Sequence, residues 1–154
     1  MLIDTSVLLR TVQVRNPFYE TATGAIERLL EQGRKPHIVP QNLVEFWAVA
    51  TRPVGSNGLG LSPEITALEI ARLKEMFEFL PDTPAIHEIW ERLVIEYQVC
   101  GKPSHDARLV AAMRAHGLKA ILTFDRDGFS RYAGIEVVHP ADIAGTQSPS
   151  PKSS

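Results

Sequence analysis

The sequence predicts an α/β fold, a three-layer α/β/α sandwich built on a parallel sheet. Two observations carry this prediction. Short apolar runs of strand length alternate with longer segments whose apolar residues recur at helical spacing. Gly and Pro residues stand between these segments, where turns are needed. The length of 154 residues suits a single domain with one sizeable core.

The first third of the chain begins directly with a short apolar run. After this run, Asp4, Thr5 and Ser6 are interpreted as turn or cap residues. Gly33 is expected to stop the helix that follows, and Pro53 to stop the next one. We therefore expect strands at residues 2–3 and 37–39, and helices at residues 17–32 and 40–52.

The middle of the chain contains two helix starts of the same kind, a hydroxyl residue followed by Pro. Residues 54–61 include three Gly and one Asn, a composition typical of a loop. Ser62 then supplies a cap before Pro63, and the helix that opens here is expected to bury Ile65 and Leu68. Thr83 and Pro84 form a second helix start, again with a hydroxyl cap residue followed by Pro. The expected elements are helices at residues 63–77 and 84–100 and a small strand at residues 79–80.

The last third is expected to add one helix and two strands. Ser104 is predicted to cap a helix over residues 105–116, and residues 120–124 and 135–138 are expected to form buried strands. From Gly145 onward the chain is polar, rich in Ser and Pro, and lacks an apolar anchor. We therefore expect one folded domain over residues 1–143 and a disordered tail over residues 144–154.

The bulk composition limits the classes of function. Sixteen basic and eighteen acidic residues give a net charge of −2, so the overall field would not attract nucleic acid. A single cysteine, Cys100, excludes an internal disulfide framework and a Cys-based zinc site. The chain shows neither a signal peptide nor an apolar run long enough to span a membrane. We expect a cytoplasmic protein.

Four acidic residues stand at places that a parallel sheet would bring together. Asp4 and Asp125 directly follow predicted strands, and such strand ends meet at one edge of the sheet. Asp106 lies in the first turn of a helix, and Glu45 lies on the helix that follows the strand at residues 37–39. Two carboxylates about 4 Å apart repel by about 4 kcal/mol at an effective dielectric near 20. Such a cluster needs cations, and its oxygen ligands suit one or two Mg²⁺ or Mn²⁺ ions.

Four sequence motifs resemble those of the PIN-domain family, and most closely the VapC-type toxin ribonucleases of toxin–antitoxin pairs. The motifs are LIDTSVLL, NLVEFWAVATRP, SHDARLVAAMRAHG and ILTFDRDGFSRY, which start at residues 2, 42, 104 and 121. Each is weak alone, but their order, flanking apolar residues and the chain length make a specific pattern. The resemblance extends from Met1 to about Ile143.

The resemblance implies a parallel sheet of strand order 3-2-1-4-5 and a metal-dependent endoribonuclease. By motif, the catalytic acids fall on Asp4, Glu45, Asp106 and Asp125. Family members hydrolyse RNA, commonly form homodimers, and are held inactive by a cognate antitoxin protein. The fourth motif varies in which acid it uses, so Asp125 is preferred here and Asp127 is kept as a supporting or substitute metal ligand.

Other residues are assigned supporting roles. Thr5, Ser6 and Thr123 are expected to orient carboxylates or water. Candidate contacts to the RNA backbone are Arg10, Arg52, Lys102, Arg108 and Arg126.

Two other functions compete with a nuclease. A non-catalytic, partner-binding module could share the fold, although such a descendant would tend to lose one of the acids. A phosphatase of the haloacid-dehalogenase type also begins with an Asp at a strand end. That chemistry requires a second Asp two residues later, where this chain has Ser6.

Overall fold

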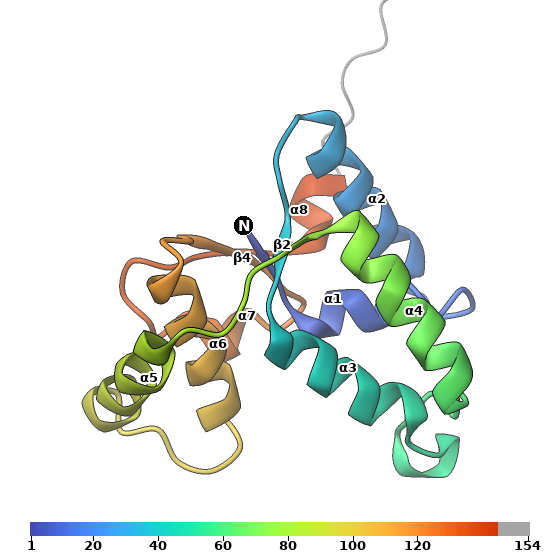
Figure 1. Ribbon diagram of the computed structural model, residues 1–154. Coiled ribbons are helices and arrows are strands. Elements are labelled where there is room, and N and C mark those ends of the chain that lie inside the picture. The colour runs from blue at the N-terminus through green and yellow to red at the C-terminus, as the bar shows by residue number, and fades with distance from the viewer. Residues whose placement is uncertain (145–154) are drawn as a thin grey trace, which may run out of the picture.

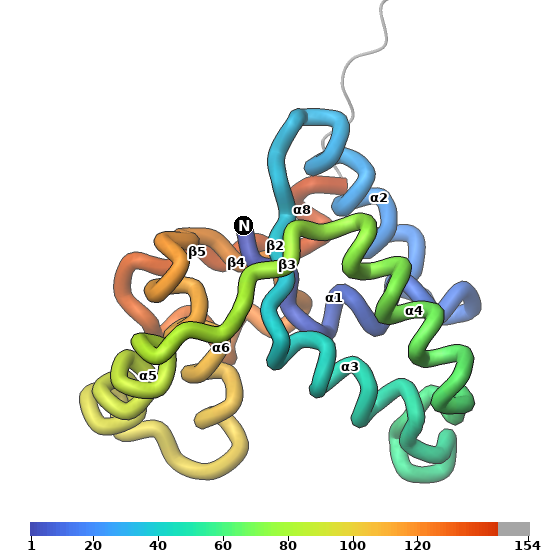
Figure 2. The backbone as a smooth tube through the Cα atoms, in the orientation of Figure 1, coloured from blue at the N-terminus to red at the C-terminus, as the bar shows by residue number. Residues whose placement is uncertain are grey.

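The computed structural model describes residues 1–144 and shows a sheet of five parallel strands in the order β3-β2-β1-β4-β5. This order confirms the predicted fold class. Figure 2 traces the backbone through the sheet, in which β2 and β3 lie side by side although helices separate them in the chain. The strands are β1 (Leu2–Ile3), β2 (His37–Ile38), β3 (Glu78–Phe79), β4 (Ala120–Leu122) and β5 (Glu136–Val138).

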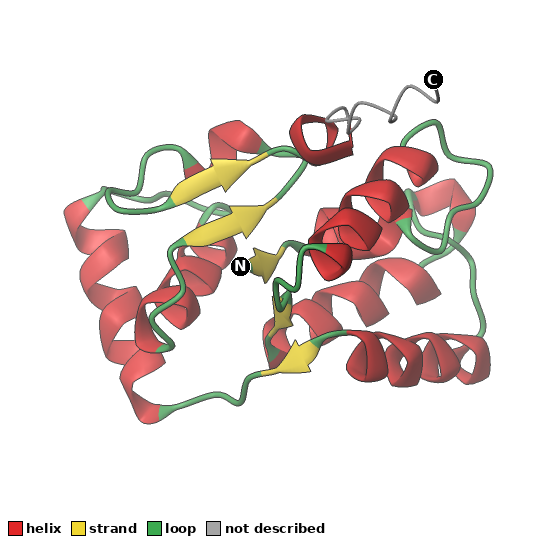
Figure 3. Cartoon of the chain, turned by 90° about the horizontal axis from the view of Figure 1, so that it is seen from above, coloured by secondary structure: helices red, strands yellow, loops and turns green. Residues whose placement is uncertain are grey.

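Helices cover both faces of the sheet, which completes the three layers (Figures 1 and 3). One group packs together on one face: α1 (Thr5–Arg10), α2 (Tyr19–Glu31), α3 (Pro40–Thr51), α4 (Pro63–Met76) and α8 (Pro140–Ala144). A short 3₁₀ helix, η1 (Val54–Ser56), joins α3 to α4. The other group covers the opposite face: α5 (Pro84–Glu96), α6 (Ser104–Ala115) and α7 (Arg126–Phe129).

The strands divide the apolar core into two clusters, one on each face of the sheet. Successive strand residues point to opposite faces. Accordingly, Ile3 and Leu122 belong to the cluster under the α1–α4 layer, and Leu2 and Ile121 belong to the cluster under α5 and α6. All four side chains are fully buried. The central strands β1 and β4 are therefore held rigidly from both sides, which fixes the direction in which their carboxyl ends point.

Several predicted helix boundaries differ from the observed ones. The residues interpreted as turn or cap residues after β1 open a helix that was not predicted, α1, with Asp4 at its cap position. The carbonyl of Asp4 accepts from the amides of Val7 and Leu8. The short helices α7 and α8 were also not predicted. Pro103, not Ser104, occupies the cap position of α6. The predicted cap at Ser62 is present, and its hydroxyl accepts from the amide of Ile65 at 3.2 Å.

The buried stripe predicted for α4 is partly wrong. Ile65 and Leu68 are 48% and 67% exposed, whereas Leu73 is fully buried. The helix packs mainly against α3 and β3, which leaves Ile65 and Leu68 in solvent.

The described residues end with the helix α8. Ala144 is the final residue of α8, so it does not begin the tail. The rest of the tail predicted over residues 144–154 lies outside the described residues. Within residues 1–144, no helix has both the length and the apolar character that crossing a membrane requires.

Candidate active site

A cavity of about 600 Å³ opens at the carboxyl edge of the sheet, where β1 and β4 end. The amide of Asp4 pairs with the carbonyl of Leu122, so the two strand ends lie side by side. The N-terminal turns of α1 and α6 and the body of α3 complete the walls. The cavity brings together all four acids predicted to be catalytic. Its charged and polar lining consists of Asp4, Thr5, Ser6, Glu45, Arg52, Lys102, His105, Asp106 and Asp125.

Asp4 lies at the bottom of this cavity and is only 7% exposed. Its Oδ2 atom accepts hydrogen bonds from the hydroxyls of Ser6 and Thr123, each at 2.7 Å. Burial raises the pKa of Asp4, the two hydroxyls oppose that rise, and the negative charge of Glu45 adds to it. The site therefore holds a buried acid whose ionised form depends on local donors.

Glu45 is held at both of its carboxylate oxygens. The Thr5 hydroxyl donates to Oε2 at 2.7 Å, and the amide of Gln41 donates to Oε1 at 2.8 Å. Thr5 is itself fixed, because the Asn42 amide lies 3.3 Å from its hydroxyl and 3.1 Å from the carbonyl of Ile3. The carboxylate on α3 is thus tied to the end of β1.

Asp106 is electrostatically coupled to the other three acids. Desolvation by burial raises its pKa, and the negative charges of Asp4, Asp125 and Glu45 raise it further, to about 6. The Lys102 ammonium opposes the shift. All four carboxylates line the same cavity, and the negative charges of the other three disfavour ionisation of Asp106.

Asp125 and Asp106 meet at the backbone of Gly128. The Gly128 amide donates to Oδ1 of Asp125 at 3.1 Å. A Cβ atom added to Gly128 would lie 2.7 Å from Oδ2 of Asp125 and 3.2 Å from Oδ2 of Asp106. The two carboxylates therefore occupy the space that a side chain at position 128 would fill.

Three residues of this site were missed in the sequence: Gln41, Asn42 and Gly128. Gln41 and Glu45 are four positions apart in one helix, a spacing that places them on the same face. That spacing was available as a signal. The fully buried Asn42 and the packing at Gly128 depend on segments far away in the chain, so no local pattern indicated them.

The predicted RNA-contact residues fall into two groups. In the described part of the chain, Arg52 and Lys102 line the cavity and the other three residues do not. Arg126 pairs with Asp142 at 2.7 Å, and Arg108 contacts Gln41 at 3.1 Å and Asp82 at 3.5 Å. Arg10 donates to the side chain of Gln13, and its buried Nε atom has no hydrogen-bond partner within residues 1–144. The structure therefore places these three outside the cavity, and their contact with RNA stays a prediction.

The alternative acid of the fourth motif lies elsewhere. Asp127 is exposed on α7 and is not part of the cavity lining formed by residues 1–144. Asp125, by contrast, lines the cavity and interacts with Asp106. The geometry favours Asp125 over Asp127 as the fourth acid.

The donor chemistry of the cavity suits a hard divalent cation. Its acids supply oxygen ligands only. Burial and, after it, the negative charges of the other three acids raise the pKa of Asp106, and a bound cation would offset those charges. Within residues 1–144, however, no three His, Cys, Asp or Glu side chains converge closely enough to enclose an ion as they stand. Hydrogen bonds from the protein hold Asp4, Glu45 and Asp125 individually. A bound ion would have to draw the carboxylates closer together.

Sequence comparison identifies a family model and a relative. The model of the PIN domain matches residues 1–135. A relative from Mycobacterium tuberculosis, named Ribonuclease VapC48, is 28% identical over 143 residues, which cover 89% of this chain and 94% of the relative.

Structure comparison agrees on the fold. A VapBC2 complex from Rickettsia felis, solved with a DNA fragment from its promoter, superposes with a TM-score of 0.66 at 12% identity and covers 90% of this chain and 96% of that chain. FitAcB from Neisseria gonorrhoeae gives a TM-score of 0.64 at 17% identity, with the same coverage of 90% and 96%. VapC20 from Mycobacterium tuberculosis, described as a toxin that cleaves the sarcin-ricin loop, gives 0.60 at 21% identity and covers 84% and 93%.

Proposed function

The chain belongs to the PIN-domain family, and from this premise we propose that it is a metal-dependent endoribonuclease, the toxin of a toxin–antitoxin pair. The observation that carries the proposal is the single cavity that carboxylates from four separate segments line together. The VapC48 relative, whose name is that of a ribonuclease, supports RNA as the substrate. A substrate of this kind is found in the cytoplasm, so we also propose that the protein acts there. Family membership removes the haloacid-dehalogenase alternative.

The proposed ligands of one or two Mg²⁺ or Mn²⁺ ions are Asp4, Asp106 and Asp125, with Glu45 beside them. When bound, such an ion lowers the pKa of a coordinated water and offsets charge on the reacting phosphate. Ser6 and Thr123 stabilise the ionised form of Asp4, which is the form that binds a cation. Glu45, fixed at both oxygens, is placed to reach a bound ion directly or through a water molecule. Arg52 and Lys102, on the cavity wall, are placed to bind the phosphates of the substrate.

A non-catalytic binding module is the competing function. It is disfavoured because a scaffold that needs only its fold gains nothing from four carboxylates in one cavity, which repel one another. A cation bound among the four carboxylates would offset this repulsion, which favours a metal-binding site.

Cleavage of RNA by the purified protein tests the enzymatic part. The wild type is expected to cut single-stranded RNA with Mg²⁺ or Mn²⁺ and to stop when EDTA is added. Asp4→Asn is expected to lower the rate by at least about 100-fold, because a metal site loses its most buried ligand. Cleavage that persists both in EDTA and in Asp4→Asn would mean that another activity, or a contaminant, cuts the RNA.

The antitoxin part of the proposal has a separate test. The VapBC2 complex from Rickettsia felis supports such a partner, and a homodimer is expected for the toxin. Inducible expression of the wild type in bacteria is expected to arrest growth, and expression of Asp4→Asn is not. The product of a small gene immediately upstream is expected to relieve the arrest. Equal growth of the two strains would contradict a toxin role.

A further inference from the structure

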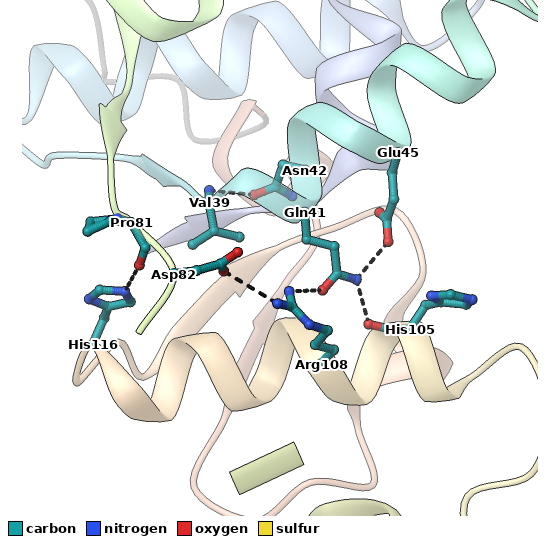
Figure 4. Close-up of polar contacts among 9 residues, drawn as sticks. All are labelled: Val39, Gln41, Asn42, Glu45, Pro81, Asp82, His105, Arg108 and His116. Carbon is teal, nitrogen blue, oxygen red and sulfur yellow. Dashed lines mark hydrogen bonds and ion pairs between the residues drawn. The ribbon is translucent and has the colours of Figure 1, made fainter. Parts of the chain in front are cut away.

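Gln41 is a buried amide between the two walls of the active site. It lies in the first turn of α3 and is only 9% exposed. Its Nε2 atom donates to Oε1 of Glu45 and to the carbonyl of His105, both at 2.8 Å, and its Oε1 atom accepts from Nη1 of Arg108 at 3.1 Å (Figure 4). A glutamine amide has two N–H donors and one carbonyl acceptor, so all of these groups are engaged.

These partners allow only one orientation of the amide. If it were flipped, its oxygen would face the Glu45 carboxylate and the His105 carbonyl, and its NH₂ group would face the Arg108 guanidinium. Each contact would then join two acceptors or two donors. Arg108 is in turn held by Asp82, at 3.5 Å, on the segment that leads into α5. The amide is thus locked from the side opposite to Glu45.

The contacts of Gln41 join α3 to α6. Glu45 is on α3, whereas His105 and Arg108 are on α6, which also carries Asp106. The other oxygen of Glu45 is held by Thr5, at the end of β1. Gln41 is therefore the contact that fixes the Glu45 carboxylate relative to α6, and Thr5 fixes it relative to β1.

We propose that Gln41 is a positioning residue for the nuclease reaction, which acts by holding Glu45 in place against the start of α6. This inference depends on the proposed function, because it assigns Gln41 a role in that reaction. It also gives Arg108 a different role from the RNA contact predicted for it: Arg108 orients Gln41. Gln41 itself does not line the cavity in the described residues, so it acts through Glu45.

A double-mutant cycle tests whether Gln41 acts through Glu45. The four proteins are the wild type, Gln41→Met, Glu45→Gln and the double variant, and kcat and KM for an RNA substrate are measured with Mn²⁺. Gln41→Met keeps the length of the side chain and removes its polar groups. It is expected to lower kcat by about 10-fold with little change in KM, within the range of losses seen when the partner of a catalytic or metal-binding group is removed. In the Glu45→Gln background the same change is expected to have little further effect.

Two additional variants separate positioning from folding. Gln41→Glu keeps an oxygen for Arg108 and loses the N–H groups that hold Glu45 and His105, so it is expected to lose kcat as Gln41→Met does. Gln32→Met makes the same chemical change at an exposed residue at the end of α2, and it is expected to match the wild type. Thermal unfolding of every variant identifies any that fails to fold. If Gln41→Met is such a variant, the cycle is run with Gln41→Glu.

Calorimetric titration with Mn²⁺ gives a readout that does not require RNA cleavage. Gln41→Met is expected to weaken Mn²⁺ binding in the wild-type background and to leave it unchanged in Glu45→Gln. Equal loss of kcat in both backgrounds, or unchanged kcat in folded Gln41 variants, would overturn the role of Gln41 and leave the nuclease intact. A wild type that neither binds Mn²⁺ nor cleaves RNA would overturn the proposed function, and the role of Gln41 with it.

Discussion

The hydroxyl of Thr123 donates a 2.7 Å hydrogen bond to Oδ2 of Asp4, although 119 positions separate the two residues. This contact joins the ends of the two central strands, β1 and β4, at the bottom of the cavity. The same hydroxyl accepts from the amide of Asp125 at 2.9 Å. One side chain therefore connects the backbone of one proposed metal ligand to the carboxylate of another.

Thr123→Val is expected to destabilise the protein by about 1–3 kcal/mol, because it removes a donor from a buried carboxylate and leaves the Asp125 amide without its acceptor. Urea unfolding in EDTA at pH 7.5 measures the change. Thr123→Ser keeps the hydroxyl and serves as the control. A Thr123→Val variant as stable as the wild type would show that the hydroxyl does not support Asp4.

Gly128→Ala is expected to lower RNA cleavage by about 10- to 100-fold, because an error of about 1 Å in the position of catalytic groups costs about that much. The added methyl would collide with the carboxylates of Asp125 and Asp106, which can rotate away without unfolding the protein. Gly55→Ala is the matched control, since its Cβ would meet no atom within 4 Å. Equal activity of the two variants would contradict the role assigned to Gly128.

Asp106→Asn is expected to stabilise the metal-free protein at pH 7.5, since it removes one charge from a cluster of like charges. The gain is on the order of 1 kcal/mol, after allowance for solvent screening of this half-buried group, and corresponds to a rise in Tm of roughly 2–4 °C. The same variant should lose RNA cleavage while its stability rises. Thermal unfolding in EDTA measures it, and a lower Tm for Asp106→Asn would mean that the ionised carboxylate is a net stabilising group.

The stability difference between the wild type and Asp106→Asn is expected to depend on pH. The pKa of Asp106 is raised from 3.8 to about 6 in the folded state, so the folded protein holds this proton more tightly than the unfolded chain does. The stabilisation that comes from this tighter proton binding by Asp106 is fully present below about pH 3.8 and is lost as the pH rises through about 6. Urea unfolding in EDTA at pH 5 and 7.5 should show a larger advantage of Asp106→Asn at the higher pH. An advantage that does not change with pH would contradict the shifted pKa.

Two of the four acids could be placed from strand positions alone. Asp4 and Asp125 each follow a short apolar run, and parallel strands end at a common edge. Glu45 and Asp106 are on helices, whose position depends on the order of the strands, and the resemblance to the PIN family supplied that order. The fold class was predictable because strand and helix periods alternate clearly along the chain.

The residues around the acids could not be predicted in the same way. Which arginine is free to bind a phosphate depends on its ion-pair partner, and Asp142 and Asp82 become the partners of Arg126 and Arg108 only in the folded chain. The space at Gly128 is likewise defined by a carboxylate on α6. Sequence patterns report local conformation and burial, whereas these contacts arise from packing between distant segments.

Calorimetric titration of the metal-free protein with Mn²⁺ at pH 7.5 tests most directly whether the acids of the cavity form a cation site. Saturable binding of one or two ions is expected, since Asp106, with a pKa of about 6, is already largely ionised at this pH. Asp4→Asn and Asp106→Asn are each expected to weaken binding by at least about 10-fold. Asp142→Asn, at an acid paired with Arg126, is expected to bind as the wild type does. Absence of saturable binding, or equal affinity in the wild type and Asp4→Asn, would contradict a metal site in this cavity.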